Sequence, residues 1–186
     1  MSPKRPDAAT RRAQLLDAAD AVFRVHGVGA PLDLIVEQAG VGRATLYRQF
    51  ADRHAILQAL MERSVERLQQ QVERLSARDD AFLLLLQYLA DRIVDSPALS
   101  DYWRTASARD PRFLPLRRQV WRAFAPSLAR AQACGLVRDD LQPGDISLLS
   151  GMLGAALRGE TDAERRRLVQ RALDIIHRGL CPAAPA

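Results

Sequence analysis

Apolar residues recur every three to four positions along nearly the whole chain, and no convincing run alternates with period two. The first pattern is that of amphipathic helices, and the second would indicate half-buried strands. The chain is therefore expected to be all-α. Glycine and proline divide the pattern into segments, because glycine favours helix ends and proline favours first turns.

The periodic segments predict about nine helices in two domains. Three short helices are expected over residues 11–25, 31–39 and 43–49, within a first domain of residues 1–52. A long connecting helix over 53–76, with Asp52 as its N-cap, opens a second domain of residues 53–186. The remainder is expected to form a bundle of about five helices, over 80–95, 97–109, 113–134, 143–158 and 162–179.

Composition narrows the class of protein. A content of 48% hydrophobic and 26% charged residues is typical of a soluble globular chain. No apolar run approaches the roughly 18 residues that span a bilayer, and the amino terminus MSPKRPDAATRR lacks the apolar core of a signal peptide. A cytoplasmic protein without membrane attachment is expected. Cys134 and Cys181 are then free thiols.

The basic charge is concentrated towards the amino terminus. The formal net charge is +5. Residues 1–12 hold four basic residues against Asp7, and residues 42–54 hold three arginines against Asp52. A basic amino-terminal module is compatible with a polyanionic partner but does not establish one.

The segment AGVGRATLYRQF (39–50) combines an apolar side with many hydrogen-bond donors. Leu46 and Phe50 lie one helical turn apart and are expected to pack, with Ile35, against the first helix. The outer side then carries Arg43, Ala44, Thr45, Tyr47, Arg48 and Gln49. Two helices joined by a short glycine-containing turn have the spacing of a helix-turn-helix, whose second helix enters the major groove of DNA.

The segment PLDLIVEQAGVGRATLYRQFADRHAIL (31–57) resembles the amino-terminal domain of the TetR family of bacterial transcriptional regulators. The family pattern is roughly I-A-x-x-A-G-V-S-x-x-T-L-Y-x-x-F-x-x-K-x-x-L. It is met at Ile35, Ala39, Gly40, Val41, Thr45, Leu46, Tyr47, Phe50 and Leu57. The chain departs from the pattern where Gly42 replaces the usual serine cap, Val36 an alanine, Arg53 a lysine, and Ala30-Pro31 a threonine pair.

The resemblance implies a sequence-specific transcriptional regulator that binds a palindromic operator in double-stranded DNA, with repression as the family default and with the protein on the bacterial nucleoid when bound. Arg43 is the expected base reader, because arginine pairs bidentately with guanine. Ala44 and Thr45 are expected at thymine methyls or phosphates, and Arg48 at a base or a phosphate. The resemblance places Tyr47 and Arg53 on phosphates. Further charge is expected from Arg11, Arg12 and the Lys4-Arg5 arm.

The family resemblance also implies a homodimer formed through the last two helices. Within DISLLSGMLGAALRG, small residues recur every four positions at Ser147, Gly151, Ala155 and Gly159, which favours close approach of another helix. The last helix adds Leu168, Ala172 and Ile175 to the expected interface. Ordinary packing within one subunit is the alternative interpretation of both sets.

Members of the family typically bind a small molecule within the bundle, so an apolar or aromatic effector is expected here. The candidate pocket residues are Leu85, Tyr88, Leu89, Tyr102, Trp103, Phe113, Trp121 and Phe124. The alternative is that these side chains are ordinary core. A second functional hypothesis is a DNA-bound adaptor whose bundle docks a protein partner; an aromatic surface patch would favour it over an enclosed cavity.

No feature of the sequence indicates an enzyme. The three histidines, His26, His54 and His177, are scattered along the chain. No paired cysteine ligands, nucleophile elbow or glycine-rich phosphate loop accompanies them. Neither a catalytic residue, a metal nor a cofactor is expected.

Overall fold

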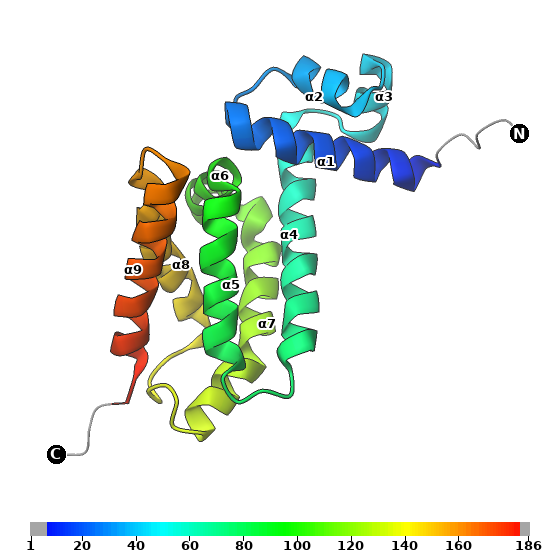
Figure 1. Cartoon of the computed structure of the whole chain (residues 1–186). Coiled ribbons are helices and arrows are strands. Elements are labelled where there is room, and N and C mark those ends of the chain that lie inside the picture. Colours follow the sequence, from blue (N-terminus) through cyan, green and yellow to red (C-terminus); the bar gives the residue numbers. More distant parts are fainter. Residues whose placement is uncertain (1–6, 183–186) are drawn as a thin grey trace, which may run out of the picture. The chain divides into compact units, whose positions relative to one another are not determined.

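The computed structural model describes residues 7–182, with the backbone alone for residues 106–109. Within this range the chain is all-helical, which confirms the predicted fold class (Figure 1). The α-helices are α1 (Ala8–His26), α2 (Leu32–Ala39), α3 (Arg43–Gln49), α4 (Arg53–Leu75), α5 (Ala81–Asp95), α6 (Pro97–Arg109), α7 (Leu114–Ala133), α8 (Ile146–Gly154) and α9 (Asp162–Leu180). None of the helices described has the length and hydropathy of a membrane span.

The chain divides into two compact units, one ending at Arg63 and the other beginning at Ser64. Helix α4 begins in the first unit and ends in the second, and it matches the connecting helix expected over 53–76. Its N-cap is the predicted Asp52, whose carboxylate accepts a hydrogen bond from the amide of Ala55 at 2.8 Å.

In the first unit, α1 packs on α2 and α2 packs on α3. Helix α1 begins about one turn before the predicted start, because the Asp7 carboxylate accepts a hydrogen bond from the amide of Thr10 at 2.7 Å and so caps it. It ends at His26 and is capped by Gly27, which takes a positive φ of 77°. One side of α1 is buried, at Leu15, Leu16, Ala18, Ala19, Val22 and Phe23.

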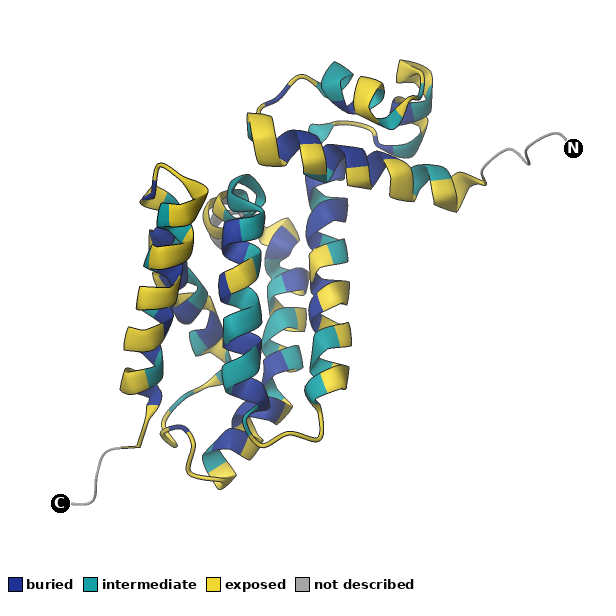
Figure 2. Ribbon diagram, viewed as in Figure 1, coloured by how far each residue is buried: buried dark blue, intermediate teal, exposed yellow. Residues whose placement is uncertain are grey.

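In the second unit, α5 packs against α6, α7, α8 and α9. Apolar residues recur at helical spacing along one side of α5, and most of that side is buried, as the colouring of Figure 2 shows. Phe82 of α5 meets Phe124 of α7 edge to face, with ring centroids 6.1 Å apart. Leu68 near the middle of α4 is also buried in this core, with Val72 and Leu75 packed against it.

The helix predicted over 143–158 is the main departure from the expected elements. It consists of a 3-10 turn (Pro143–Asp145), α8, and a second 3-10 turn (Ala155–Arg158). A 3-10 turn rises further per residue than an α-helix and repeats every three residues. Positions four apart therefore do not stay on one line through this segment.

Candidate nucleic-acid interface

The turn between α2 and α3 is formed by two glycines in different conformations. Gly40 ends α2 in the left-handed region, with φ 63° and ψ 34°. Its amide donates to the carbonyl of Glu37, and the amide of Val41 donates to the carbonyl of Val36. Gly42 is extended, with φ −80° and ψ 153°, and α3 starts at the next residue. The helix-turn-helix predicted from the sequence is therefore present, with α3 bounded as expected.

Helix α3 is anchored from behind and exposed in front. Leu46 and the following Phe50 are buried, together with Ile35 of α2. The residues facing away from this core include four exposed ones and two half-buried ones. The exposed residues are Arg43, Ala44, Tyr47 and Arg48, and the half-buried residues are Thr45 and Gln49. Most of the predicted DNA-contacting side chains on α3 are thus accessible from one side.

Two exposed arginines of α3 have partners within this unit. Arg43 Nη2 donates to Asp33 Oδ2 of α2 at 2.5 Å. Arg48 Nη2 donates to Thr45 Oγ1 at 3.2 Å, one turn earlier in the same helix. The guanidinium groups of both are thereby held near the outer surface of α3. Asp33 was not anticipated, because the sequence marks it only as an acidic residue in the first turn of α2.

Arg53, expected at a phosphate, and Arg12, expected to add charge towards DNA, both donate to backbone carbonyls. Arg12 Nη1 donates to the Gln49 carbonyl at 3.1 Å, and its guanidinium lies 4.4 Å from the centroid of the Phe50 ring. Arg53 Nη1 donates to the Val28 carbonyl at 2.6 Å. The bond from Arg12 satisfies a carbonyl at the end of α3, and the bond from Arg53 satisfies a carbonyl in the turn after α1.

These two arginines therefore help to hold the unit together, a role that the sequence did not reveal, because their partners lie 37 and 25 residues away. Arg11 is half-buried on α1. The Lys4-Arg5 arm lies outside the described residues.

Comparison with known proteins relates the chain to one family of regulators. The sequence model of the bacterial regulatory proteins of the tetR family matches residues 15–60, which contain the whole helix-turn-helix. A TetR transcriptional regulator of Streptomyces coelicolor has a similar structure, with a TM-score of 0.69 and 28% identity over 93% of this chain and 99% of that one. Residues 15–60 therefore carry the DNA-binding domain of the TetR family. A TetR regulatory protein of Mycobacterium vanbaalenii gives a TM-score of 0.67 and 26% identity, over 96% of this chain and 99% of that one.

A third solved structure shows likeness of fold alone. SmeT, the repressor of the multidrug efflux pump SmeDEF of Stenotrophomonas maltophilia, has a TM-score of 0.63 and 24% identity, over 94% of this chain and 92% of that one. A comparison with curated proteins finds no match. The domain match and the structural likeness show the fold of a TetR-family DNA-binding transcriptional regulator, and regulators of this family are not enzymes.

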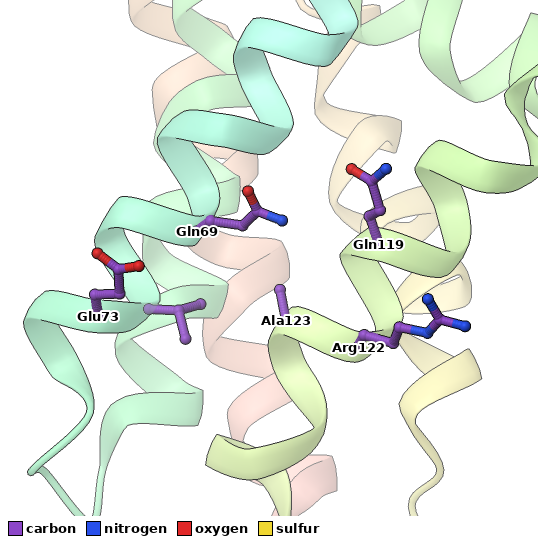
Figure 3. A pocket seen from close by; sticks show the side chains of 6 residues that line it. Gln69, Glu73, Gln119, Arg122 and Ala123 are labelled. Atoms are coloured by element: carbon purple, nitrogen blue, oxygen red, sulfur yellow. The ribbon is translucent and has the colours of Figure 1, made fainter.

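The second unit contains an open pocket of about 440 Å³ between α4 and α7. Gln69 and Glu73 project from α4, and Gln119, Arg122 and Ala123 from α7 (Figure 3). Val72 completes the lining. Half-buried Val72 and Ala123 give the pocket an apolar floor, and the exposed polar side chains surround it.

The eight predicted pocket residues do not line this pocket. Leu85, Phe113 and Phe124 are fully buried and pack in the interior of the unit. Phe113 meets Tyr102 edge to face, with centroids 6.2 Å apart. The half-buried members are Tyr88, Leu89, Tyr102, Trp103 and Trp121. Helical spacing predicts that a side chain lies on the apolar face of its helix. It does not show whether that side chain fills the core or lines a cavity.

The predicted dimer residues fall into two groups in the structure. Gly159 is buried, and a Cβ there would lie 2.9 Å from the Arg165 amide nitrogen, so this glycine packs within its own subunit. Leu168 and Ala172 are half-buried against the core. The others are exposed or beside open space: Ser147, Gly151, Ala155 and Ile175. Ser147 Oγ also accepts a hydrogen bond from Trp121 Nε1 at 2.9 Å.

The most exposed large apolar residues of α8 and α9 are the predicted Ile175 and two residues that flank the small-residue pattern, Leu148 and Met152. Leu148 and Met152 of α8 are 65% and 44% exposed, and Ile175 of α9 is 53% exposed. These two helices pack against each other, as Figure 1 also shows. We call Leu148, Met152 and Ile175 the α8–α9 apolar group.

Proposed function

We propose that the chain is a homodimeric repressor that binds a palindromic operator through α3 and is released from it by a small molecule. The observation that carries this proposal is α3 itself, which is anchored by buried Leu46 and Phe50 and presents exposed Arg43, Tyr47 and Arg48 on its other side. Such a helix satisfies the requirements of major-groove recognition. The likeness of fold to SmeT, the repressor of an efflux pump, supports repression as the mode of action.

The DNA contacts are proposed residue by residue. Arg43 reads a base, since arginine pairs bidentately with the major-groove edge of guanine. Ala44 and Thr45 contact thymine methyls or phosphates, and Arg48 a base or a phosphate. Phosphate contacts come from Tyr47, Arg11, Arg12 and Arg53. For Arg12 and Arg53 the remaining donors of the guanidinium serve this purpose, because each arginine carries five N–H groups.

The α8–α9 apolar group supports dimerisation through α8 and α9. Large apolar side chains exposed together mark interaction surfaces. One helix-turn-helix reads only a few base pairs, and a symmetric dimer places two of them on half-sites about 34–36 Å apart or a multiple of that spacing. The proposed interface therefore retains Ser147, Gly151, Ala155 and Ile175 and adds Leu148 and Met152.

The α4–α7 pocket is the proposed effector site. Its volume of about 440 Å³ lies within the range of small-molecule sites. Val72 and Ala123 suit an apolar body, while Gln69, Glu73, Gln119 and Arg122 offer amides and both signs of charge to polar groups. A ligand there contacts the second half of α4, and the same helix carries the buried Leu57 and Leu60 in the first unit.

An effector is favoured over a docked protein partner by the placement of the bundle aromatics. Tyr88, Trp103 and Trp121 are half-buried. None of them is among the exposed large apolar residues of the described chain. The aromatic surface patch that an adaptor would require is therefore not what these side chains form.

The experiment measures binding of the purified chain to its own upstream DNA by fluorescence anisotropy, with and without a panel of amphiphilic compounds. Arg43→Ala is expected to cost roughly 1–3 kcal/mol in operator affinity. Arg118→Ala, which removes an exposed arginine of α7, serves as the matched control. Ala123→Leu should fill the pocket and abolish release by an active compound without weakening DNA binding. If Arg43→Ala leaves the operator affinity unchanged, Arg43 does not read a base as proposed.

A further inference from the structure

The ion pair between Asp33 and Arg43 joins the two helices of the helix-turn-helix at the surface proposed to face DNA. Arg43 is the first residue of α3, and Asp33 is in the first turn of α2. Their side chains are 70% and 50% exposed, and the Nη2–Oδ2 distance is 2.5 Å. Ion pairs this exposed contribute little to the stability of a fold. Its position on the proposed base reader suggests a different role.

The geometry of a guanidinium allows Arg43 to keep this partner while it reads a base. The group presents two edges that can each donate two parallel hydrogen bonds, one formed by Nη1 and Nη2 and the other by Nε and Nη2. Nη2 carries one hydrogen on each edge. A single carboxylate oxygen at Nη2 therefore occupies one edge and leaves the other free. The free edge matches the O6 and N7 acceptors of guanine.

We propose that Asp33 is a specificity-determining residue, which holds the Arg43 guanidinium in the orientation that reads guanine and limits its use as a general phosphate contact. This inference rests on the proposed function. Without Asp33, the flexible arginine side chain must lose its rotamer freedom on binding. It is then also free to turn towards phosphates, which carry no sequence information.

The charge of Asp33 acts in the same direction. A carboxylate at the DNA-facing surface repels the phosphate backbone and so weakens binding to every sequence. At the specific site this repulsion is offset, because the Arg43 guanidinium that Asp33 orients forms both of its hydrogen bonds to guanine there. Asp33 is thus expected to lower affinity for non-specific DNA and to raise the ratio of specific to non-specific binding.

Glu37 provides a matched control on the same helix. It is exposed on α2, four residues after Asp33, and its side chain forms no hydrogen bond or ion pair with the described part of the chain. Glu37→Ala removes the same charge without affecting the orientation of Arg43. A difference between Asp33→Ala and Glu37→Ala therefore separates orientation from general electrostatics.

The experiment selects preferred duplexes from a randomised DNA library with the wild-type chain. It then measures the affinity of each variant for the selected duplex, for its single-base substitutions and for a scrambled duplex. Arg43→Ala identifies the base pair that Arg43 reads. Because a bidentate arginine contact discriminates by roughly 5- to 150-fold, Asp33→Ala is expected to lower discrimination at that base pair by about 3- to 10-fold and to raise affinity for the scrambled duplex. Glu37→Ala should leave discrimination unchanged.

Each other outcome overturns a distinct step. If Asp33→Ala and Glu37→Ala give the same discrimination, the inference is wrong while the proposed function stands. If Arg43→Ala changes no base preference, Asp33 has no reader to orient, although operator binding remains. A wild-type chain that selects no sequence overturns the proposed function and this inference together. Asp33→Asn, which keeps the size of the side chain, replaces Asp33→Ala if thermal unfolding shows the latter to be misfolded.

Discussion

Arg63 Nη1 on α4 lies 2.6 Å from Asp17 Oδ1 on α1, within the first unit. The same guanidinium donates through Nη2 to the Leu16 carbonyl at 3.2 Å and lies 3.6 Å from Asp20 Oδ2. The Arg63 side chain is only 17% exposed, whereas that of Asp17 is 70% exposed. Arg63 therefore fastens the first half of α4 to α1 through three partners.

Replacing Arg63 by alanine is expected to lower the free energy of unfolding by about 1–2 kcal/mol, since charge-assisted bonds of a largely buried group are lost. Asp17→Ala is expected to cost less, about 0–1 kcal/mol, because the exposed carboxylate is well solvated without its partner. Urea denaturation followed by circular dichroism measures both. Arg67→Ala, at an exposed position one turn later in α4, is the control. Equal midpoints for Arg63→Ala and Arg67→Ala would contradict the proposed fastening.

Gly40 is expected to be sensitive to alanine because of its backbone and not because of crowding. Its φ of +63° lies in the left-handed region, and a Cβ there would meet nothing within 4 Å. Alanine in this conformation costs roughly 1–2 kcal/mol. Gly29→Ala, also in open space but without a positive φ, should be close to neutral. Thermal unfolding of the two variants measures the difference, and similar melting temperatures would argue against a conformational role for Gly40.

The fold could be predicted from the sequence where short-range chemistry determines it. The bounds of α3, the turn of Gly40 to Gly42 and the cap at Asp52 all depend on residues within four positions of each other. The 3-10 turns around α8 were missed, because they alter a period of 3.6 to 3 over only a few residues. At Gly154, before the second turn, a Cβ would lie 3.3 Å from the Arg104 side chain of α6, and such a tertiary contact leaves no local pattern.

The candidate site shows the same division between local and tertiary information. Exposure of Arg43 and burial of Leu46 follow from helical spacing alone. The partner of Arg43 on α2 and the carbonyl partners of Arg12 and Arg53 depend on how helices pack, so they could not be predicted. Helix packing also determines that Leu85, Phe113 and Phe124 lie in the core and that the open pocket lies elsewhere, so these features could not be predicted either.

Substitution of Gly159 by alanine is expected to be destabilising, because the added Cβ would lie too close to a backbone atom. The added Cβ would lie 2.9 Å from the Arg165 amide nitrogen at the start of α9, and a backbone atom cannot rotate away. Overpacking of this kind costs typically 1–3 kcal/mol. Gly179→Ala, inside α9 with open space around it, should instead gain up to about 1 kcal/mol from helix propensity. Chemical denaturation should therefore move the two midpoints in opposite directions, and a shift in the same direction would contradict this packing.

The burial of His177 predicts that the folded state loses stability at acidic pH. Burial lowers the pKa of this imidazole below its ordinary value of 6.5, against an opposing effect of Asp174. As the pH falls below 6.5, the unfolded chain binds a proton at this site before the folded chain does. The unfolded state is therefore favoured, and stability falls with decreasing pH in this window. Above it, both states are neutral and the contribution is constant.

The measurement compares wild type and His177→Gln by urea denaturation between pH 8 and pH 5. The substitution should remove part of the decline below pH 6.5, so the difference in free energy between the two proteins changes with pH. The difference at pH 8 serves as the internal reference for the packing cost of the substitution. A difference that stays constant over the whole range would show that His177 makes no such contribution.

The α8–α9 apolar group predicts that a charge at Ile175 separates the proposed dimer. Ile175 is 53% exposed in the subunit, so glutamate there is well solvated in a monomer and leaves the fold intact. In an interface the same carboxylate must be buried without a partner, which costs roughly 2 kcal/mol or more and raises the dissociation constant about 30-fold or more. Val25→Glu, at an apolar residue of α1 that is 75% exposed, is the matched control. Sedimentation equilibrium over a range of protein concentrations should give a dimer for wild type and Val25→Glu and a monomer for Ile175→Glu; an unchanged dimer in the last variant would place the interface elsewhere.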